Sequence, residues 1–425
     1  MKNIIDYVKE YGSHTFSEHP LNEVDALVLS QLAYLNYEPF VPTLEEYNAP
    51  VSIQGIYHHP DKERILDGYW YREENMALFT AAVKSVRFGS LKLNYYVNVV
   101  NEDKEVQFSA VTYVLDDKNA FIAYRGTDAT IIGWKEDLNL AFSKPVYSQQ
   151  LSVKYMEQVA NYIGGDFYAG GHSKGGNLAM YAAMNCCEDA RENLICVYSN
   201  DGPGFRPEIL QMGNYEAIKE RAVKFIPRSS VVGVLLESQN YYEVVESGSI
   251  GMLQHNSFSW KVEGKSFVRA KNMKDSKVFW DAAMNEWILS LSEEELHSFI
   301  DTFYHVVSAS EAKDVFQLGA NWKKSMQSMG EAMRGIDEET GKAIRKMIRA
   351  LFETAREMAK AEIAERGQEV TKEVKELQRE WKEAQKEFQK QFQEKSFFRT
   401  DSKIRQIRKI RKNPAKIVDT EEEKR

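Results

Sequence analysis

The sequence predicts an α/β fold with a mixed, mostly parallel sheet, followed by an all-helical C-terminal extension. Between residues 91 and 226, short apolar runs of strand type alternate with helical patterns, which is typical of a parallel sheet covered by helices. After about residue 290 little strand signal remains and charged helical patterns take over. We therefore predict a first domain at 1–290 and a helical region at 291–425.

The first part of the chain combines two helical patterns with an irregular segment. Apolar residues recur at helical spacing over 21–37, and a second such pattern runs through 76–83. Between them lies a turn-rich piece with four prolines. Irregular segments of this length often cover a functional site. Residues 38–88 are thus a candidate lid.

Six strands are predicted, the first three in direct succession. The period-two or apolar runs are 91–100, 105–115 and 121–124, then 166–169, 194–200 and 222–226. Helical patterns near 148–163, 177–187 and 215–221 separate the later strands. The alternation predicts that the later strands run parallel with helices on both faces of the sheet.

The helical extension opens with a capping box, Ser292 to Glu295. Within 344–392, apolar residues spaced by four and three lie among Glu and Lys, which predicts a coiled-coil-like helix that forms a homodimer or folds back on the body. The basic, amphipathic segment 403–416 suits peripheral contact with an anionic membrane surface, or is a solvated tail.

Composition and charge narrow the function classes. The chain has 425 residues, 43% of them hydrophobic, and a net charge of -8, which disfavours nucleic acid as a partner. Charged residues interrupt the N-terminus, and we find no apolar run of about 18 residues. Three cysteines cannot build a disulfide framework and lack zinc-site spacing. We expect a cytoplasmic protein, with the inner face of the membrane as an alternative.

The sharpest motif is GGHSKGGNLA at 170–179, which contains a G-x-S-x-G between a predicted strand and a predicted helix. This is the context of the nucleophile elbow of α/β-hydrolases, in which a serine stands on a strained turn and flanking glycines prevent collisions. Ser173 would then lie at a helix N-terminus, where the Lys174 amide can stabilise an oxyanion. The alternative is a glycine-rich turn without chemistry.

Together with this motif, the segment FIAYRGTD at 121–128 resembles the class 3, or fungal-type, lipases and especially their bacterial intracellular relatives. Further matches are GWKEDL at 133–138, YSNDGPGF at 198–205, the strand region from Phe225 and LQHNSFSW at 253–260. The resemblance covers roughly residues 25 to 264. It implies an α/β-hydrolase fold and a carboxylic ester substrate.

Carried over by this resemblance, Ser173 matches the nucleophile and His255 the general base, while the amides of Thr127 and Lys174 match the oxyanion donors. A serine needs such a base to become a useful nucleophile, and a neutral histidine can take its proton and return it to the leaving alcohol. We interpret Arg125 as a brace for its loop and His172 as structural, since neighbours on a tight elbow point apart.

The acid that would orient His255 departs from the family pattern. The resemblance places an aspartate after the strand AVKFI, where this chain has Ser229 and Ser230. Asp201 follows the preceding strand at the carboxyl edge of the sheet and is our candidate. Its alternative is a turn aspartate in NDGPG. Asp128 and Asp137 we interpret, by resemblance, as loop-ordering residues.

We therefore predict a serine hydrolase that cleaves a carboxylic ester, of a lipid or a small molecule, through an acyl-Ser173 intermediate. The aromatic segment 68–79 is a candidate acyl site or part of the core. No metal or nucleotide motif is present, so we expect no cofactor. The alternatives are a catalytically impaired scaffold that binds a partner or a membrane through its C-terminal helix, and a transferase that passes the acyl group to an alcohol.

Overall fold

The computed structural model of the protein describes residues 2–45, 49–66, 71–101, 106–127, 140, 145–230, 232–236, 242–249, 254–270, 290–310, 322–338, 340–345 and 348. The chain separates into two compact units, Met1–Arg356 and Glu357–Arg425, and every described residue belongs to the first. The proposed division between 1–290 and 291–425 stays a prediction.

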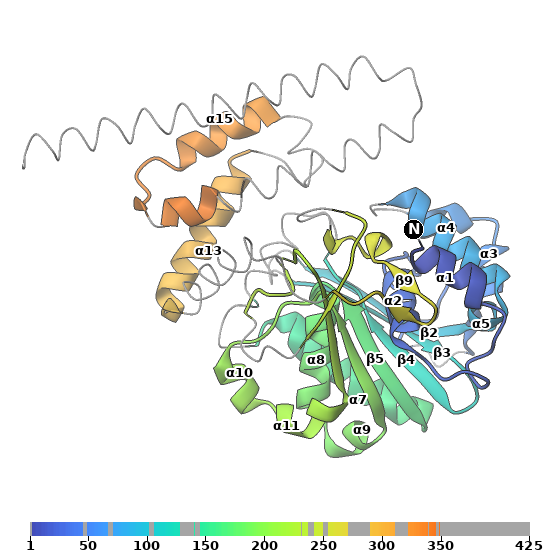
Figure 1. The fold of residues 1–425 in the computed structure, drawn as a ribbon. Coiled ribbons are helices and arrows are strands. Elements are labelled where there is room, and N and C mark those ends of the chain that lie inside the picture. The colour runs from blue at the N-terminus through green and yellow to red at the C-terminus, as the bar shows by residue number, and fades with distance from the viewer. Residues whose placement is uncertain are drawn as a thin grey trace, which may run out of the picture. The chain divides into compact units, whose positions relative to one another are not determined.

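An eight-stranded sheet forms the centre of the fold, with the strands in chain order (Figure 1). The strands are β1 (Val51–Ser52), β2 (Lys92–Asn101), β3 (Val106–Val114), β4 (Asn119–Tyr124), β5 (Asp166–His172), β6 (Leu194–Asn200), β7 (Ala222–Pro227) and β8 (Glu243–Val245). Strands β1 to β4 pair antiparallel and β4 to β8 pair parallel. The predicted mixed, mostly parallel sheet is confirmed.

Helices cover both faces of this sheet and bury two separate apolar clusters. One face carries α1 (Ile4–Tyr11), α2 (Glu23–Leu32), α3 (Ile53–Tyr57), α4 (Arg72–Lys84) and α5 (Val86–Gly89). The other carries α7 (Tyr147–Ile163), α8 (Lys174–Asn185), α9 (Glu188–Glu192), α10 (Pro207–Met212) and α11 (Tyr215–Ile218). Strand β4 contributes to both clusters, because successive side chains of a strand point to opposite faces.

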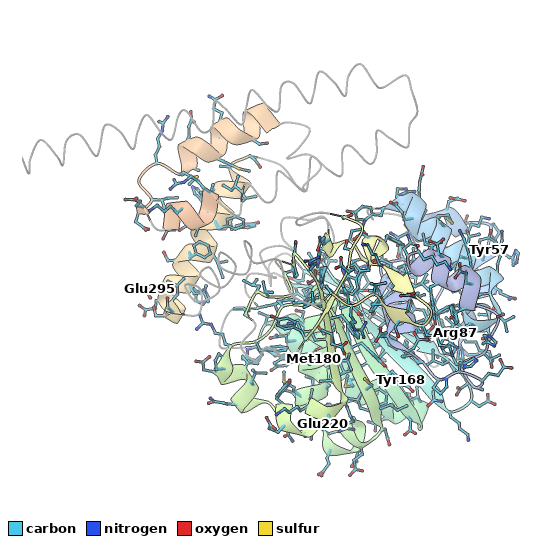
Figure 2. All side chains as sticks on the ribbon, viewed as in Figure 1. Tyr57, Arg87, Tyr168, Met180, Glu220 and Glu295 are labelled. Atoms are coloured by element: carbon cyan, nitrogen blue, oxygen red, sulfur yellow. The ribbon has the colours of Figure 1, made fainter. Side chains whose placement is uncertain are left out.

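Different side chains lie on the two faces of the sheet. Arg87 lies among the N-terminal helices, and Met180 lies on α8 over the sheet (Figure 2). Met180 belongs to the cluster under α7 and α8, whereas Tyr168 on β5 packs against the cluster under α1 and α2. A single sheet therefore supports two cores, as expected for an α/β domain.

The helix predicted over 21–37 is shorter than expected. Its observed part, α2, ends at Leu32, and the chain then turns while Leu35 and Tyr37 stay fully buried. The Tyr37 hydroxyl donates to the Leu32 carbonyl at 3.0 Å, which satisfies a helix-end acceptor. The apolar pattern in the sequence continues past Leu32 because residues of the following turn are also packed in the core.

The candidate lid 38–88 contributes much to the core where it is described. Ile53, Ile56, Leu78 and Phe79 are essentially inaccessible to solvent. For Leu78 and Phe79, the interpretation of the aromatic segment as core packing is therefore confirmed. The lid role itself stays a prediction.

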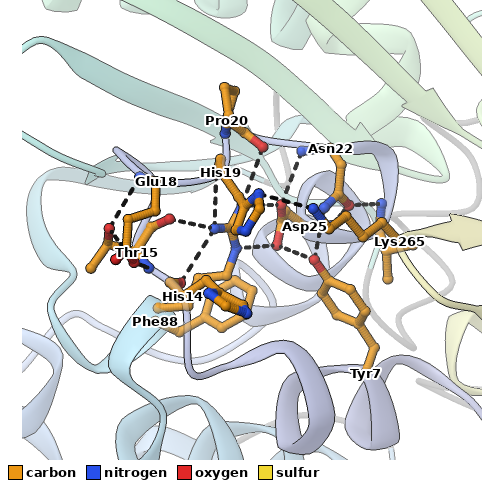
Figure 3. Close-up of polar contacts among 12 residues, drawn as sticks. Tyr7, His14, Thr15, Glu18, His19, Pro20, Asn22, Asp25, Phe88 and Lys265 are labelled. Atoms are coloured by element: carbon orange, nitrogen blue, oxygen red, sulfur yellow. Dashed lines mark hydrogen bonds and ion pairs between the residues drawn. The ribbon is translucent and has the colours of Figure 1, made fainter.

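A buried ion pair joins the N-terminal helices (Figure 3). Arg87 Nη2 lies 2.6 Å from Asp25 Oδ2, and Arg87 Nε donates to Asp25 Oδ1 at 2.8 Å. The Tyr7 hydroxyl donates to the same Oδ1 at 2.9 Å. These contacts hold α1, α2 and α5 together at one point of the fold.

Short elements that the sequence did not predict follow the last long strand. They are the 3-10 helix η4 (Ser257–Ser259) and the hairpin of β9 (Val262–Glu263) with β10 (Ser266–Phe267). Strand β8, only three residues long, also went unpredicted. Runs of two or three residues are too short for periodicity to be visible.

The C-terminal extension begins as predicted. The Ser292 hydroxyl accepts from the Glu295 amide and the Glu295 carboxylate accepts from the Ser292 amide, so the capping box that opens α13 (Glu293–Ser308) is confirmed. Helix α15 (Trp322–Ala332) follows. The predicted dimer helix 344–392, apart from residues 344, 345 and 348, and the tail 403–416 lie outside the described residues.

From the sequence we also expected no membrane-spanning helix and no disulfide framework. Within the described part of the chain, none of the helices combines the length and the apolar character needed to cross a bilayer. The three cysteines, Cys186, Cys187 and Cys196, are free thiols.

Candidate active site

Ser173 stands on a tight turn between β5 and α8. Its backbone angles, φ 58° and ψ -132°, belong to a region that residues with a side chain rarely adopt. The Ser173 amide donates to the Asn200 carbonyl on β6 at 2.9 Å, which ties the turn to the neighbouring strand. The strand, strained serine and helix predicted from the motif are all present.

The tight turn at Ser173 requires the glycines of the motif, because other parts of the backbone pass very close to them. A Cβ on Gly171 would lie 2.2 Å from the carbonyl carbon of Gly175. A Cβ on Gly175 would lie 2.1 Å from the carbonyl oxygen of Tyr124 at the end of β4. No side chain fits at either position, which agrees with the steric reason for the motif.

Lys174 is the first residue of α8, so its amide is one of the N–H groups of the first helical turn, which point away from the helix body. Its side chain serves another purpose, because the buried Nζ donates to the Gln107 carbonyl on β3 at 2.8 Å. Thr127 follows β4, two residues after Arg125, whose Nη2 donates to Asn98 on β2 at 3.2 Å. The Asn98 contact fits the interpretation of Arg125 as a brace.

His255 and Asp201 are in direct contact, although they lie 54 positions apart in the chain. His255 Nδ1 lies 2.6 Å from Asp201 Oδ2. Asp201 directly follows β6, and its side chain is fully buried. Because a carboxylate can only accept, His255 Nδ1 carries the proton, and the lone pair of a neutral imidazole lies on Nε2.

The second carboxylate oxygen is also occupied. The Ser230 hydroxyl donates to Asp201 Oδ1 at 2.5 Å and accepts from the Gly233 amide at 2.8 Å. The Asp201 amide donates to the Phe225 carbonyl on β7 at 2.7 Å. Asp201 has a φ of 51°, so these contacts hold it in a left-handed conformation that is uncommon for residues with a side chain.

The loop that carries His255 has little regular structure and is held by side chains instead. The Gln254 side chain accepts from the Ser229 amide at 2.8 Å, and the Trp260 indole donates to the Gln254 carbonyl at 2.9 Å. The Ser257 hydroxyl donates to Gln31 on α2 at 2.6 Å. These bonds fix the loop to the turn that follows β7 and to α2, and so fix the position of His255.

His172, the residue before the elbow serine, lies against His255. The two ring centroids are 4.6 Å apart with an angle of 31° between the planes. Burial lowers the pKa of His172 to about 3, and the neighbouring His255 contributes to this lowering, so the ring is neutral near pH 7. The interpretation of His172 as structural stays a prediction, and the structure adds that its ring packs against the His255 ring.

Ser173 and His255 are not hydrogen-bonded to each other in this structure. Among the residues that the structure describes, neither Ser173 Oγ nor His255 Nε2 has a hydrogen-bond partner. Ser173 is nearly buried, at 9% exposure, and the His255 side chain is 30% exposed. Both side chains thus remain at least partly accessible to solvent.

A family model described as Mbeg1-like matches residues 82–305, more than half of the chain. The protein belongs to the Mbeg1-like family. This family is lipase-like, in agreement with the resemblance noted from the motifs. The matched range of the Mbeg1-like chain includes Ser173, Asp201 and His255.

Solved lipase structures are also similar to this Mbeg1-like chain. M37 lipase has 15% sequence identity and a TM-score of 0.32, with 49% of this chain and 68% of the lipase covered. The native Rhizomucor miehei lipase propeptide complex has 17% identity and a TM-score of 0.26, covering 37% and 57%. A deletion mutant of the same complex has 15% identity and a TM-score of 0.30, covering 44% and 70%. The search of curated proteins found no match.

Of the candidate site residues, the structure brings Asp201 and His255 into direct contact. The contact between Asp201 and His255 makes Asp201 the carboxylate beside the histidine, while Ser230, at the expected family position, binds Asp201 instead. Of the remaining candidates, Asp128 and Asp137 lie outside the described residues. The roles of Ser173, His255, Asp201, Thr127 and Lys174 stay predictions.

Sequence reasoning missed the residues that support the site. Tyr34, Gln31 and Ser230 carry no motif, and each is positioned by the fold rather than by a neighbour in sequence. Helical spacing over 21–37 marks this stretch of the chain as packed, but it does not tell which partner a polar residue meets.

The Mbeg1-like chain offers no described metal centre. No group of three or more His, Cys, Asp or Glu side chains is placed to hold an ion in the parts of the chain that the structure describes. An open groove of about 1170 Å³ lies between α1, α4, α5 and the 3-10 helix η1 (Lys62–Leu66), and neither Ser173 nor His255 lines it.

Proposed function

We propose that the protein hydrolyses a carboxylic ester through an acyl-Ser173 intermediate. The observation that carries the proposal is the 2.6 Å contact between His255 Nδ1 and the buried Asp201 carboxylate, beside a serine on a strained elbow. The family supports a lipase-like hydrolase in general. The serine mechanism and the substrate are the parts that we add.

In the first half of the reaction, His255 Nε2 takes the proton of Ser173 Oγ as the oxygen attacks the ester carbonyl. Asp201 stabilises the resulting imidazolium and keeps the proton on Nδ1. The tetrahedral oxyanion accepts from the Lys174 amide at the α8 N-terminus and from the Thr127 amide. Protonated His255 then gives its Nε2 proton to the leaving alcohol, and the acyl group stays on Ser173.

In the second half, water replaces the alcohol. His255 Nε2 takes a proton from water, the hydroxide attacks the acyl carbon, and the same amides hold the second oxyanion. The proton returns to Ser173 Oγ as the acid leaves. An alcohol in place of water would make the same enzyme an acyltransferase.

The unformed bond between Ser173 and His255 is compatible with this proposal. Catalytic hydrogen bonds are often long in the absence of substrate and tighten in the substrate complex. Both atoms lack other described partners, so no existing bond has to be broken before they meet.

The substrate class is a lipid or small-molecule ester, a proposal that follows the lipase-like family rather than a described pocket. The aromatic segment 68–79 supports an acyl site only in part, because Leu78 and Phe79 are already buried in the core. Tyr71, in the same segment, is another candidate for contact with an acyl chain, because its ring packs against Phe258 in the loop that carries His255.

The test is labelling of the full chain with a fluorophosphonate probe, which reacts with activated serines. We expect labelling of the wild type and of His58→Ala, an exposed histidine that serves as the control, and none of Ser173→Ala or His255→Ala. Labelling that survives Ser173→Ala would place the nucleophile elsewhere. A folded wild type that does not label in the presence of detergent or lipid would favour the impaired scaffold.

A further inference from the structure

The ring of His172 lies between two residues from distant parts of the chain. On one side, Nδ1 lies 3.1 Å from the hydroxyl of Tyr34, which follows α2. On the other, Nε2 lies 2.8 Å from the backbone carbonyl oxygen of His255. A chain of hydrogen bonds therefore runs from Tyr34 through His172 to His255.

For a neutral His172 ring, one arrangement of protons satisfies both contacts. A carbonyl oxygen cannot donate, so His172 Nε2 must carry the proton and donate it to His255. In a neutral ring, Nδ1 is then an acceptor, and the Tyr34 hydroxyl donates to it. Protonation of His172 would remove this acceptor and would place a second positive charge beside the His255 imidazolium that the reaction forms.

The same phenol also contacts the segment that carries the predicted oxyanion amide. A Cβ on Gly126 would lie 2.0 Å from the Tyr34 hydroxyl oxygen and 2.6 Å from the His172 carbonyl oxygen. Gly126 therefore leaves the space that lets Tyr34 reach His172. Thr127 is the next residue, so Tyr34 lies where the elbow and the Thr127 loop meet.

We propose that Tyr34 and His172 are positioning residues that hold the His255 loop, and with it the general base, against the nucleophile elbow. The inference rests on the proposed function, because it assigns a role relative to Ser173 and His255. The His172 ring is hydrogen-bonded to the Tyr34 hydroxyl and to the His255 carbonyl rather than to Ser173 Oγ or His255 Nε2. His172 acts by a directed bond to the His255 carbonyl and by the face of its ring, and Tyr34 acts by fixing the His172 ring.

The proposed reaction requires that His255 be placed accurately relative to Ser173. Across residues 254–270, the described stretch around His255, the longest regular element has three residues, and the bonds from Gln254 and Ser257 fix the chain on either side of His255. The bond from His172 is made to His255 itself. A displacement of about 1 Å at a reacting group can lower a rate about 100-fold, so a single anchor at this residue can matter far more than its own stability.

The chain offers graded variants of this anchor. His172→Phe keeps a flat ring but removes the donor, whereas His172→Gln keeps an N–H donor near the position of Nε2. Tyr34→Phe removes only the hydroxyl. Tyr37→Phe is the matched control, because it also removes a hydroxyl, one that donates to Leu32 and lies outside the site.

The experiment measures the saturable rate of fluorophosphonate labelling, which separates the limiting rate from the apparent affinity for the probe. For His172→Phe we expect a limiting rate about 100-fold lower with little change in affinity. His172→Gln should recover at least about tenfold of this loss. Tyr34→Phe should lose about threefold to tenfold, the value of one hydrogen bond, and Tyr37→Phe should label like the wild type.

A second readout does not depend on turnover. The proton between His255 Nδ1 and Asp201 should give a low-field proton NMR signal that broadens or shifts in His172→Phe and is retained in His172→Gln and Tyr37→Phe. Equal effects of His172→Phe and His172→Gln on rate and signal would overturn the inference, as would a normal signal in His172→Phe. If the wild type does not label at all, the proposed function fails, and the NMR signal alone decides whether His172 positions His255.

Discussion

Two fully buried aspartates, Asp25 and Asp201, each face a basic side chain, yet the surroundings of the two pairs differ. Asp25 meets Arg87, whose side chain is only 2% exposed, and Asp201 meets His255, whose side chain is 30% exposed. Both pairs contain a contact of 2.6 Å. Distance and the burial of the carboxylate therefore do not separate the pair between the N-terminal helices from the pair that we propose to be catalytic.

The two pairs differ in how many nitrogen atoms of the basic side chain are already hydrogen-bonded. Arg87 also donates to backbone carbonyls of the loop before α2, namely those of His14, Thr15, His19 and Pro20 (Figure 3). Burial disfavours its charge, but the bonds to Asp25 and the Asp25 charge raise the pKa of Arg87, so it stays charged. All three nitrogens are occupied, whereas His255 has one bonded nitrogen and one without a described partner.

A buried ion pair whose nitrogen atoms are all hydrogen-bonded fixes the fold, whereas a pair with one nitrogen left without a described partner and a partly exposed ring is suited to proton transfer. The two pairs should therefore respond to mutation in opposite ways. Changes at Asp201 should reduce reactivity more than stability, and changes at Arg87 should do the reverse.

The largest effect is expected from Asp201→Asn. The amide cannot hold His255 in the required tautomer, so the rate of fluorophosphonate labelling should fall by about 10⁴, equivalent to about 5.5 kcal/mol of activation free energy. The second-order labelling rate measures it. Asp25→Asn is the matched control and should label normally per folded molecule. Equal labelling rates in the two variants would remove the distinction between the pairs.

The next effect is expected from Arg87→Met. Without the guanidinium, the Asp25 charge is left buried and unpaired, which should lower the free energy of unfolding by about 3–5 kcal/mol. Urea unfolding of the full chain measures it. Lys2→Met, which breaks the exposed ion pair with Glu10, is the control and should leave the unfolding midpoint unchanged. A small loss in Arg87→Met would mean that Arg87 is not the organising residue of the N-terminal helices.

A smaller effect is expected when the unpaired carboxylate is removed as well. Adding Asp25→Leu to Arg87→Met removes the unpaired charge and should recover roughly 1–2 kcal/mol of the lost stability. Recovery stays partial because the backbone carbonyls that Arg87 bound still lack a donor. The same unfolding experiment measures it. Full recovery would show that the pair alone, and not the carbonyl contacts, carries the stability.

The smallest effect concerns pH. The folded-state pKa of His172 is lowered to about 3 by burial, below the ordinary value of about 6.5 expected when unfolded. The unfolded chain therefore binds the extra proton below about pH 6.5, and stability is lost as the pH falls from about 6.5 toward 3. Between about pH 6.5 and about pH 5.5 this group should cost about 1 kcal/mol.

Unfolding free energies of wild type and His172→Gln at these two pH values measure the contribution of His172. Glutamine does not titrate, so the variant should lose less stability on acidification than the wild type. Identical pH dependence in the two proteins would mean that His172 is protonated as easily when folded as when unfolded. The groups that face His172 are Tyr34, His255 and Asp201.

Much of the sheet was predictable because strand and helix periods are local properties. The runs at 91–100, 166–169, 194–200 and 222–226 all became strands, and the serine turn lies between β5 and α8 as the motif predicts. Helix ends were less accurate, since apolar residues past Leu32 pack into the same core without being helical. Short pieces such as β8 and η4 gave no periodic signal at all.

From the sequence alone we predicted six of the eight strands of the main sheet, the elbow with its two glycines, and a short list of residues for the candidate site. These follow from local sterics and periodicity. Three contacts became visible in the folded chain alone: that of Asp201 with His255, that of Ser230, which follows β7, with Asp201, and the link that His172 makes between Tyr34 and His255. The physical reason is that these hydrogen bonds join residues 29 to 138 positions apart, so they depend on how strand ends and loops converge, and no local pattern encodes that convergence.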